Sequence, residues 1–271
     1  MTGWIRSWPW AVGDSSRPCG SRGFSRPPHT ADREERVKHA MPSGGHLVDA
    51  SVNARAWNHI AVQDSTGDDA GAVPERIEWT CWPGRGPGAE FIGDPAGLRV
   101  AELGCGTGEH IAYAAAHGAR LAVGVDIAEQ RIAQARARFG HLPALVWRVG
   151  DAAQELAELP RLDVCFSIYG ALWYADPAQL LPVIHNRLRP GGLLAFSVNG
   201  PRPGELPGRR VDNLTLTSGT RLPVVHYSYD ADAWRGLLDE HGFAPPEVLP
   251  VEGPAGSPYR TFVIRAHRIG D

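Results

Sequence analysis

The sequence predicts an α/β protein built around a parallel sheet that is covered by helices. After Pro95, short apolar runs alternate with longer segments whose apolar residues have helical spacing, and the connecting turns are short. A glycine-rich turn follows the first apolar run, and an acidic residue ends the second. Both features are typical of the carboxyl edge of a parallel sheet, where ligands bind in this class of fold.

The alternation predicts five strands and three helices between residues 98 and 199. Each apolar run has the length of a strand that is buried on both faces. The expected strands are Leu98–Leu103, Leu121–Asp126, Ala144–Val149, Leu162–Ile168 and Leu193–Asn199. The expected helices are Glu109–His117, Ala128–Phe139 and Pro177–Leu188. Proline in the first turn of the third helix suits that position, and the turn Arg189-Pro190-Gly191-Gly192 ends it.

The last seventy residues predict a hairpin, a helix and two strands. Two alternating runs, Asn213–Thr217 and Arg221–Tyr227, flank the turn residues 218–220. A helix is expected over Asp230–His241 because Gly242 follows it. A short strand near Val248 and a final strand over Tyr259–His267 complete the expected elements, and we assign residues 96–271 to one domain.

Two further segments are expected before this domain. Residues 1–40 have no helical or strand period, and we expect a disordered leader; Met41 is a candidate natural start. Residues 41–95 are expected to form a helix, over Ser51–Gln63, and a lid rich in Gly and Pro. The lid contains Trp79, Trp82 and Phe91. These aromatic residues either belong to a cover over a binding site or pin a loop to the core.

Composition narrows the class of function. The 271 residues are 43% hydrophobic with a net charge of −3, which excludes a wholly disordered chain and gives no field that attracts nucleic acid or an anionic membrane. The four cysteines form no CxxC pair, so neither a metal site nor a disulfide framework is indicated. Because no apolar run approaches about 20 residues, we expect a soluble, cytoplasmic protein without a membrane partner.

The strongest motif is the segment Glu102-Leu103-Gly104-Cys105-Gly106-Thr107-Gly108 between a strand and a helix. Glycines at such a turn allow backbone amides to approach a ligand, because a Cβ atom there would collide with it. A dinucleotide-binding loop reads GxGxxG, whereas here the third glycine comes one residue early. The loop therefore predicts a cofactor site and counts against an NAD-dependent oxidoreductase.

Two acidic residues follow the next two strands. Asp126 ends the second strand, where a carboxylate can accept hydrogen bonds from both hydroxyls of a ribose. Asp151, after Gly150, follows the third strand and precedes Ala152, where a carboxylate can accept a bond from an adenine amine. Either residue alone would be interpreted as a helix cap; their order and spacing after Glu102 favour a cofactor site.

The segments VAELGCGTGEH, GVDIA, VGDA, LDVCFSIYGALWYADP and LRPGGLLAFSV resemble, in order, five motifs of the class I S-adenosylmethionine-dependent methyltransferases, small-molecule type. The resemblance covers Leu98 to Asn199 well and Asp230 to His267 more loosely. It implies a doubly wound, mostly parallel sheet of seven strands with one antiparallel strand near the C-terminus. It also implies a helical lid at the N-terminus.

The resemblance implies a role for each matching residue toward S-adenosylmethionine, with no metal. Glycines of the loop would lie beneath the methionine part, and Glu102 would hold the loop. These glycines are Gly104, Gly106 and Gly108. The other expected contacts are Asp126 with the ribose, Ile127, Asp151 and Ala152 with the adenine, Ser167 and Ile168 with the sulfonium, and Trp57 from the lid.

The acceptor side is expected around the aromatic residues Tyr169, Trp173 and Tyr174, which follow the fourth strand; ordinary aromatic packing is the alternative. A hydroxyl acceptor would need a general base. His226, in the hairpin near 213–228, ranks first as catalytic residue; Tyr169 and His59 are further candidates, with His110 beside them.

We therefore expect methyl transfer to a small-molecule acceptor by in-line displacement, as in a tailoring enzyme of secondary metabolism. A protein that keeps the cofactor fold for binding or regulation is the alternative. Nucleic-acid methylation is disfavoured, because the strand-four motif of the enzymes that methylate amino groups of nucleic acids is replaced by Ser167-Ile168-Tyr169-Gly170. The oligomeric state is left open, a homodimer included.

Overall fold

A computed structural model describes residues 45–64, 71–202, 204–216, 218–257 and 259–270. The expected leader over residues 1–40 and the candidate start at Met41 lie outside the described residues.

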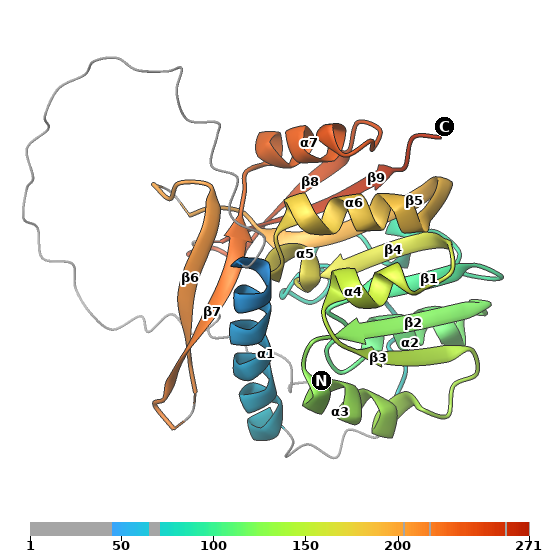
Figure 1. Ribbon diagram of the computed structural model, residues 1–271, viewed down its shortest axis with the longest axis horizontal. Coiled ribbons are helices and arrows are strands. Elements are labelled where there is room, and N and C mark those ends of the chain that lie inside the picture. The colour runs from blue at the N-terminus through green and yellow to red at the C-terminus, as the bar shows by residue number, and fades with distance from the viewer. Residues whose placement is uncertain (1–44, 65–70, 203, 217, 258, 271) are drawn as a thin grey trace, which may run out of the picture.

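A seven-stranded sheet forms the centre of the structure, in the order β3-β2-β1-β4-β5-β9-β8 (Figure 1). Its strands are β1 (Arg99–Leu103), β2 (Leu121–Asp126), β3 (Leu145–Val149), β4 (Leu162–Ile168), β5 (Leu188–Asn199), β8 (Glu247–Glu252) and β9 (Arg260–His267). Strands β1 to β5 pair in parallel, whereas β9 is antiparallel to both of its neighbours. The predicted doubly wound sheet with one antiparallel strand is confirmed.

Helices cover both faces of the sheet. They are α2 (Glu109–Ala116), α3 (Glu129–Phe139), α4 (Ala152–Ala157), α5 (Ala171–Tyr174), α6 (Pro177–Arg187) and α7 (Ala231–Glu240). One hydrophobic cluster joins the sheet to α4, α6 and α7, and a second joins its other face to α2 and α3. Successive strand residues alternate between the clusters, as Val164 and Cys165 do. Both faces are therefore buried, which explains the continuously apolar strand sequences.

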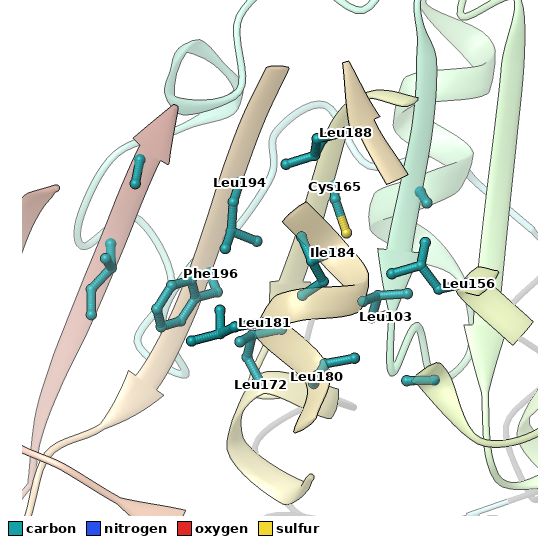
Figure 2. Close-up of a cluster of buried hydrophobic side chains, with 14 of the residues drawn as sticks. Leu103, Leu156, Cys165, Leu172, Leu180, Leu181, Ile184, Leu188, Leu194 and Phe196 are labelled. Carbon is teal, nitrogen blue, oxygen red and sulfur yellow. The ribbon is translucent and has the colours of Figure 1, made fainter. Parts of the chain in front are cut away.

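Figure 2 shows the first cluster, in which α6 lies against the sheet. Leu180, Leu181 and Ile184 of α6 are fully buried beside Cys165 and Phe196. Leu180, Leu181 and Ile184 recur at helical spacing, so one stripe of α6 faces the core. The polar end of this helix, with Arg187, extends beyond that stripe.

A second structural unit stands beside the sheet. Helix α1 (Gly45–Asp64) lies along a two-stranded arm made of β6 (Gly208–Thr215) and β7 (Arg221–Ser228) (Figure 1). Ala56 and Ile60 of α1 pack on Leu214 and Val224 of the arm. The predicted N-terminal helix and hairpin are both present. No helix among the described ranges is both long and apolar enough to span a membrane.

The segment 71–97 lies against the α2 and α3 face of the sheet. Trp79 is fully buried; its ring meets Phe91 and Phe166 edge to face, and its indole N–H donates to the Gly88 carbonyl at 3.0 Å. Trp82 remains partly exposed. Of the two interpretations of these aromatic residues, the structure shows core anchoring for Trp79 and Phe91.

The sequence did not predict three elements or the start of β5. Helices α4 and α5 and the 3-10 helix η2 (Ala89–Phe91) have at most 6 residues, which is too short to display a helical repeat. The predicted turn at residues 189–192 is an irregular stretch within β5. There the pairing with β4 jumps from Leu162 opposite Leu188 to Val164 opposite Leu193, so residues 189–192 bulge out of the ladder and the strand resumes after them.

We expect Trp79→Ala to lower the free energy of unfolding by about 3–5 kcal/mol, because it leaves a large cavity in the core. Urea denaturation followed by circular dichroism measures the change. The matched control is Trp82→Ala, where the truncated ring is partly exposed, and we expect a loss of about 1 kcal/mol or less. An equal loss for the two variants would contradict the role of Trp79 as the core anchor.

Candidate functional site

The glycine loop connects β1 to α2 at the carboxyl edge of the sheet. Gly104, Gly106 and Gly108 have φ values of +77°, +55° and +85°. A Cβ atom on Gly104 would lie 2.6 Å from the Ala171 backbone nitrogen, and one on Gly108 would lie 2.3 Å from the Trp147 ring. A Cβ on Gly106 would have no atom within 4 Å. Gly104 and Gly108 therefore serve internal packing, and Gly106 is the glycine that faces open space.

Asp126 joins this loop to the end of β2. Its Oδ2 accepts a hydrogen bond from the Gly106 N–H at 2.8 Å, and its Oδ1 accepts one from the Ala128 N–H at 2.8 Å. The side chain is only 9% exposed. Burial raises the pKa of the Asp126 carboxyl, and the two backbone hydrogen bonds partly offset that rise.

Glu102 is buried beneath the loop on β1, with 1% of its surface exposed. Its Oε1 lies 3.5 Å from Nδ1 of His110, while its Oε2 has no hydrogen-bond partner among the described residues. Burial raises the pKa of the Glu102 carboxyl, and the hydrogen bond from His110 partly offsets the rise. A buried carboxylate oxygen without a partner indicates a missing donor, such as a bound ligand or a water.

The expected adenine-side residues lie at the next strand end. Asp151 caps α4, because its Oδ1 accepts hydrogen bonds from the N–H groups of Ala153 and Gln154 at 3.0 and 3.2 Å. The helix-cap interpretation therefore holds for one of its oxygens. Ala152 is buried behind it, and Ile127 is half-buried just beyond Asp126.

Ser167 belongs to the structural frame. Its hydroxyl donates to the Leu103 carbonyl at 2.7 Å and accepts from the Leu172 N–H at 3.3 Å, and the side chain is fully buried. Sequence reasoning did not single out Gly170, although a Cβ there would lie 2.3 Å from the Leu103 carbonyl oxygen. These contacts press the β4–α5 connection, with the half-buried Ile168 before it, against the glycine loop.

The structure brings the expected acceptor-side aromatic residues together with the lid helix. The centroid of the Trp173 ring lies 5.7 Å from the ring centroid of Tyr169, 5.1 Å from that of Tyr174 and 5.3 Å from that of His226. Trp57 of α1 meets Tyr174 edge to face at 5.2 Å. Because Ala171 of the same helix touches Gly104, this aromatic group is adjacent to the glycine loop.

Tyr169 has a strained backbone and an engaged hydroxyl. Its φ is +44°, a left-handed conformation that is rare for a bulky residue and is found at functional sites. Its hydroxyl is hydrogen-bonded to Thr261, which in turn donates to Asn199 at 3.1 Å. Burial raises the pKa of Tyr169 well above its ordinary value, so the phenol keeps its proton and acts as a neutral polar group.

His226 lies on β7, 8% exposed, in a narrow cavity beside Trp173. Its Nε2 is 3.7 Å from Oδ2 of Asp212 on the neighbouring strand. Burial lowers the pKa of His226, and Asp212 partly opposes the shift, so the imidazole is neutral near pH 7. The other residues that line the cavity are Asn199, Gly200, Arg202, Glu205, Ser228 and Tyr259.

Sequence reasoning missed Asp212, Asn199 and Arg202. Asp212 could have been found, because it pairs with Val224 two positions before His226, which places both side chains on one face of the hairpin. Asn199 and Arg202 approach the cavity from the end of β5, a proximity that no local pattern encodes.

The structure does not bring His59 into this site. His59 lies on the exposed face of α1, where Nδ1 is 3.0 Å from the Arg55 carbonyl of its own helix. Across the described part of the chain, no group of three or more His, Cys, Asp or Glu side chains is placed to hold a metal ion.

Residues 100–192 match a family described as a methyltransferase domain. An S-adenosyl-L-methionine-dependent Diels-Alderase of Talaromyces variabilis is 30% identical over 159 residues, 55% of this chain and 54% of that protein. A trans-aconitate 2-methyltransferase of Azoarcus sp. is 33% identical over 142 residues, 48% of this chain and 54% of that protein. The chain thus spans about half the length of these curated relatives.

Solved structures share the fold. The 1,6-didemethyltoxoflavin-N1-methyltransferase of Burkholderia thailandensis superposes with a TM-score of 0.55 over 89% of this chain and 99% of that chain, at 20% identity. A methyltransferase from Listeria monocytogenes, described as putative and S-adenosylmethionine dependent, superposes with a TM-score of 0.54 over 65% of this chain and 92% of that chain, at 22% identity. Residues 100–192 are therefore similar to a methyltransferase domain, and the seven-stranded sheet has the fold of these solved S-adenosylmethionine-dependent methyltransferases.

Proposed function

We propose that the protein transfers a methyl group from S-adenosylmethionine to a small-molecule acceptor. The observation that supports this most is the arrangement around Gly106. Asp126 and Glu102 are buried on either side of the loop, one oxygen of Glu102 has no partner, and Gly106 faces open space. A buried acceptor oxygen beside a loop whose middle glycine faces open space suits a polar ligand with hydroxyl and ammonium groups.

The residues present fit this cofactor. Asp126 would accept hydrogen bonds from the ribose hydroxyls, Glu102 would accept from the ammonium group directly or through water, and Ile127 would contact the adenine. Trp57 would cover the methionine end from α1. When bound, S-adenosylmethionine supplies an electrophilic methyl group on a sulfonium and leaves as S-adenosylhomocysteine.

On the acceptor side, His226 is the proposed general base. The ring is neutral near pH 7, as a base requires, and Asp212 can stabilise the imidazolium that forms when it takes a proton from the acceptor. Trp173 and Tyr174 would exclude water and place aromatic faces near a cationic sulfur, which lowers the cost of desolvating it. The enzyme's main task is to hold the acceptor atom about 3 Å from the methyl group, in line with the breaking bond.

A small molecule is the proposed class of acceptor because the cavity at His226 is small and is lined in part by the arm. The relatives by name act on small molecules, trans-aconitate in one case and a toxoflavin precursor in another. We extend that class, and a role in secondary metabolism, to this chain as part of the proposal.

We expect S-adenosylhomocysteine to bind in isothermal titration calorimetry, and Asp126→Ala to raise its Kd by on the order of 10- to 100-fold. The reason is that the variant removes two charge-assisted hydrogen bonds of roughly 1.5–3 kcal/mol each, part of which the rearranged loop recovers. Asp126→Asn keeps one oxygen acceptor and the side-chain size, so its Kd should lie between those of the wild type and Asp126→Ala.

The matched control is Asp230→Ala, which removes a helix cap on α7, where the carboxylate accepts from the Ala233 N–H at 2.8 Å. Its Kd for S-adenosylhomocysteine should match that of the wild type. Tighter binding of NADH than of S-adenosylhomocysteine, or an unchanged Kd in Asp126→Ala, would contradict the proposed cofactor.

His226→Gln should lower methyl transfer by about 100-fold for a hydroxyl acceptor, because general bases contribute about 10²- to 10⁴-fold. The measurement follows label from methyl-labelled S-adenosylmethionine into a panel of small acceptors that includes trans-aconitate. Cofactor affinity should stay unchanged, because the ring lies on the arm and not on the glycine loop. Wild-type turnover in this variant would remove His226 from the mechanism.

The pH dependence follows from the lowered pKa of His226. Its neutral, active form persists down to below about pH 6.5, the ordinary value for histidine, so the transfer rate should be flat above that pH. The rate should fall only as the pH drops further and the ring becomes protonated. Initial rates measured from pH 5 to 9 with saturating cofactor test this; a rate that keeps rising through pH 8 would indicate a different base.

A further inference from the structure

Asn53 on α1 is a buried polar residue that has no role in the proposed methyl transfer. It is 3% exposed, and its carboxamide forms three hydrogen bonds. Oδ1 accepts from the Val225 N–H at 2.8 Å, and Nδ2 donates to the Val225 carbonyl at 2.9 Å and to the Tyr174 carbonyl at 3.0 Å. One side chain thereby connects helix α1, strand β7 and helix α5.

The two bonds to Val225 take the place of a neighbouring strand. Strand β7 pairs with β6 in a two-stranded sheet, so the other edge of β7 has no strand partner. The Asn53 carboxamide satisfies both backbone groups of Val225 at that edge, as a peptide group would. Asparagine suits the position because a carboxamide donates and accepts in one plane; aspartate accepts only.

The third bond aligns two walls of the acceptor cavity. Val225 precedes His226 on β7, and Tyr174 follows Trp173 on α5. The rings of His226 and Trp173 lie 5.3 Å apart, edge to face. Asn53 therefore connects the chain neighbours of both members of this ring pair.

Other polar contacts of α1 reach either the arm or α3, and Asp49 also accepts from the Tyr227 hydroxyl of the arm at 3.3 Å. Asp49 pairs with Arg209 on the arm at 2.7 and 2.6 Å, and Asn58 accepts from the Gln130 N–H on α3 at 3.0 Å. Gln134 of α3 donates to the Ala61 carbonyl at 2.8 Å. These contacts dock the helix; the contacts of Asn53 span from the arm to α5.

We propose that Asn53 is a positioning residue that fixes His226 against Trp173 in the acceptor site. This proposal rests on the proposed function, since it presumes that His226 acts on an acceptor. The claim that the Asn53 hydrogen bonds keep the His226 ring buried does not depend on which acceptor binds. Loss of the carboxamide leaves two carbonyls and one N–H without partners, and β7 should move away from α5 to hydrate them.

The test measures the pKa of His226 by NMR in protein with labelled histidine, with His226→Gln used to identify its signal among the 11 histidines. Charged groups that face this ring are Asp212 and Arg210 on β6 and Glu205 and Arg202 before it. In the wild type the pKa should lie below the ordinary value of about 6.5. In Asn53→Ala and in Asn53→Leu, neither of which adds a charge, it should rise toward that value, because the ring gains water.

Gln134→Ala is the matched control, since it removes one hydrogen bond of α1 on the side away from the arm. It should leave the pKa of His226 unchanged, and all three variants should bind S-adenosylhomocysteine like the wild type. An unchanged pKa in a folded Asn53 variant, or an equal shift in Gln134→Ala, would overturn the proposal.

If neither Asn53 variant shows a cooperative thermal transition, Asn53 is required for folding and the proposal is also wrong. Failure of the wild type to bind S-adenosylhomocysteine would instead contradict the proposed function. The two failures are distinguishable because the titration of His226 needs no ligand.

Discussion

The site depends on a direct contact between two backbone segments, the glycine loop after β1 and the connection after β4. A Cβ on Gly104 would reach the Ala171 nitrogen at 2.6 Å, and one on Gly170 would reach the Leu103 carbonyl at 2.3 Å. The Ser167 hydroxyl closes the contact by bonding both segments. Because nothing separates the two connections, a ligand on the loop must lie beside α5 and its aromatic rings. The proposed cofactor and acceptor compartments are therefore neighbours.

Burial, rather than net charge, sets the chemistry of this edge of the sheet. Asp126 and Glu102 are almost fully enclosed, and burial raises the pKa of both. Backbone N–H groups compensate Asp126, whereas one oxygen of Glu102 has no hydrogen-bond partner among the described residues. The same effect acts in the opposite direction on His226, where burial favours the neutral ring. A near-neutral protein can therefore contain the acidic residues of the proposed cofactor site and a neutral imidazole, the proposed base, in one structure.

Helix α1 docks by a stripe that is half polar and half apolar. Asp49 and Asn53 form hydrogen bonds with the arm, and Ala56 and Ile60 pack on it. Hydrogen bonds to an unpaired strand edge are directional, so they fix the helix in one register where an apolar stripe alone would permit sliding. The arm in turn places His226 and Asp212 over the aromatic rings. An arm and a helix that are remote in sequence form one wall of the site.

The sequence by itself determined the sheet, the glycine loop and the position of Asp126, because each follows from local spacing: apolar runs of strand length, glycines where φ is positive, and an acid at a strand end. It also placed His226, Trp173 and Tyr174 near the acceptor side by resemblance. Only the tertiary structure decided that Trp79 is a core anchor, that His59 is exposed, that Asp212 lies 3.7 Å from His226, and that Asn53 bonds to the neighbouring Val225. Those roles depend on contacts between segments far apart in the chain, such as the 172 positions between Asn53 and Val225. Local periodicity contains no information about such contacts, since packing and hydrogen bonding select them only once the whole chain has folded.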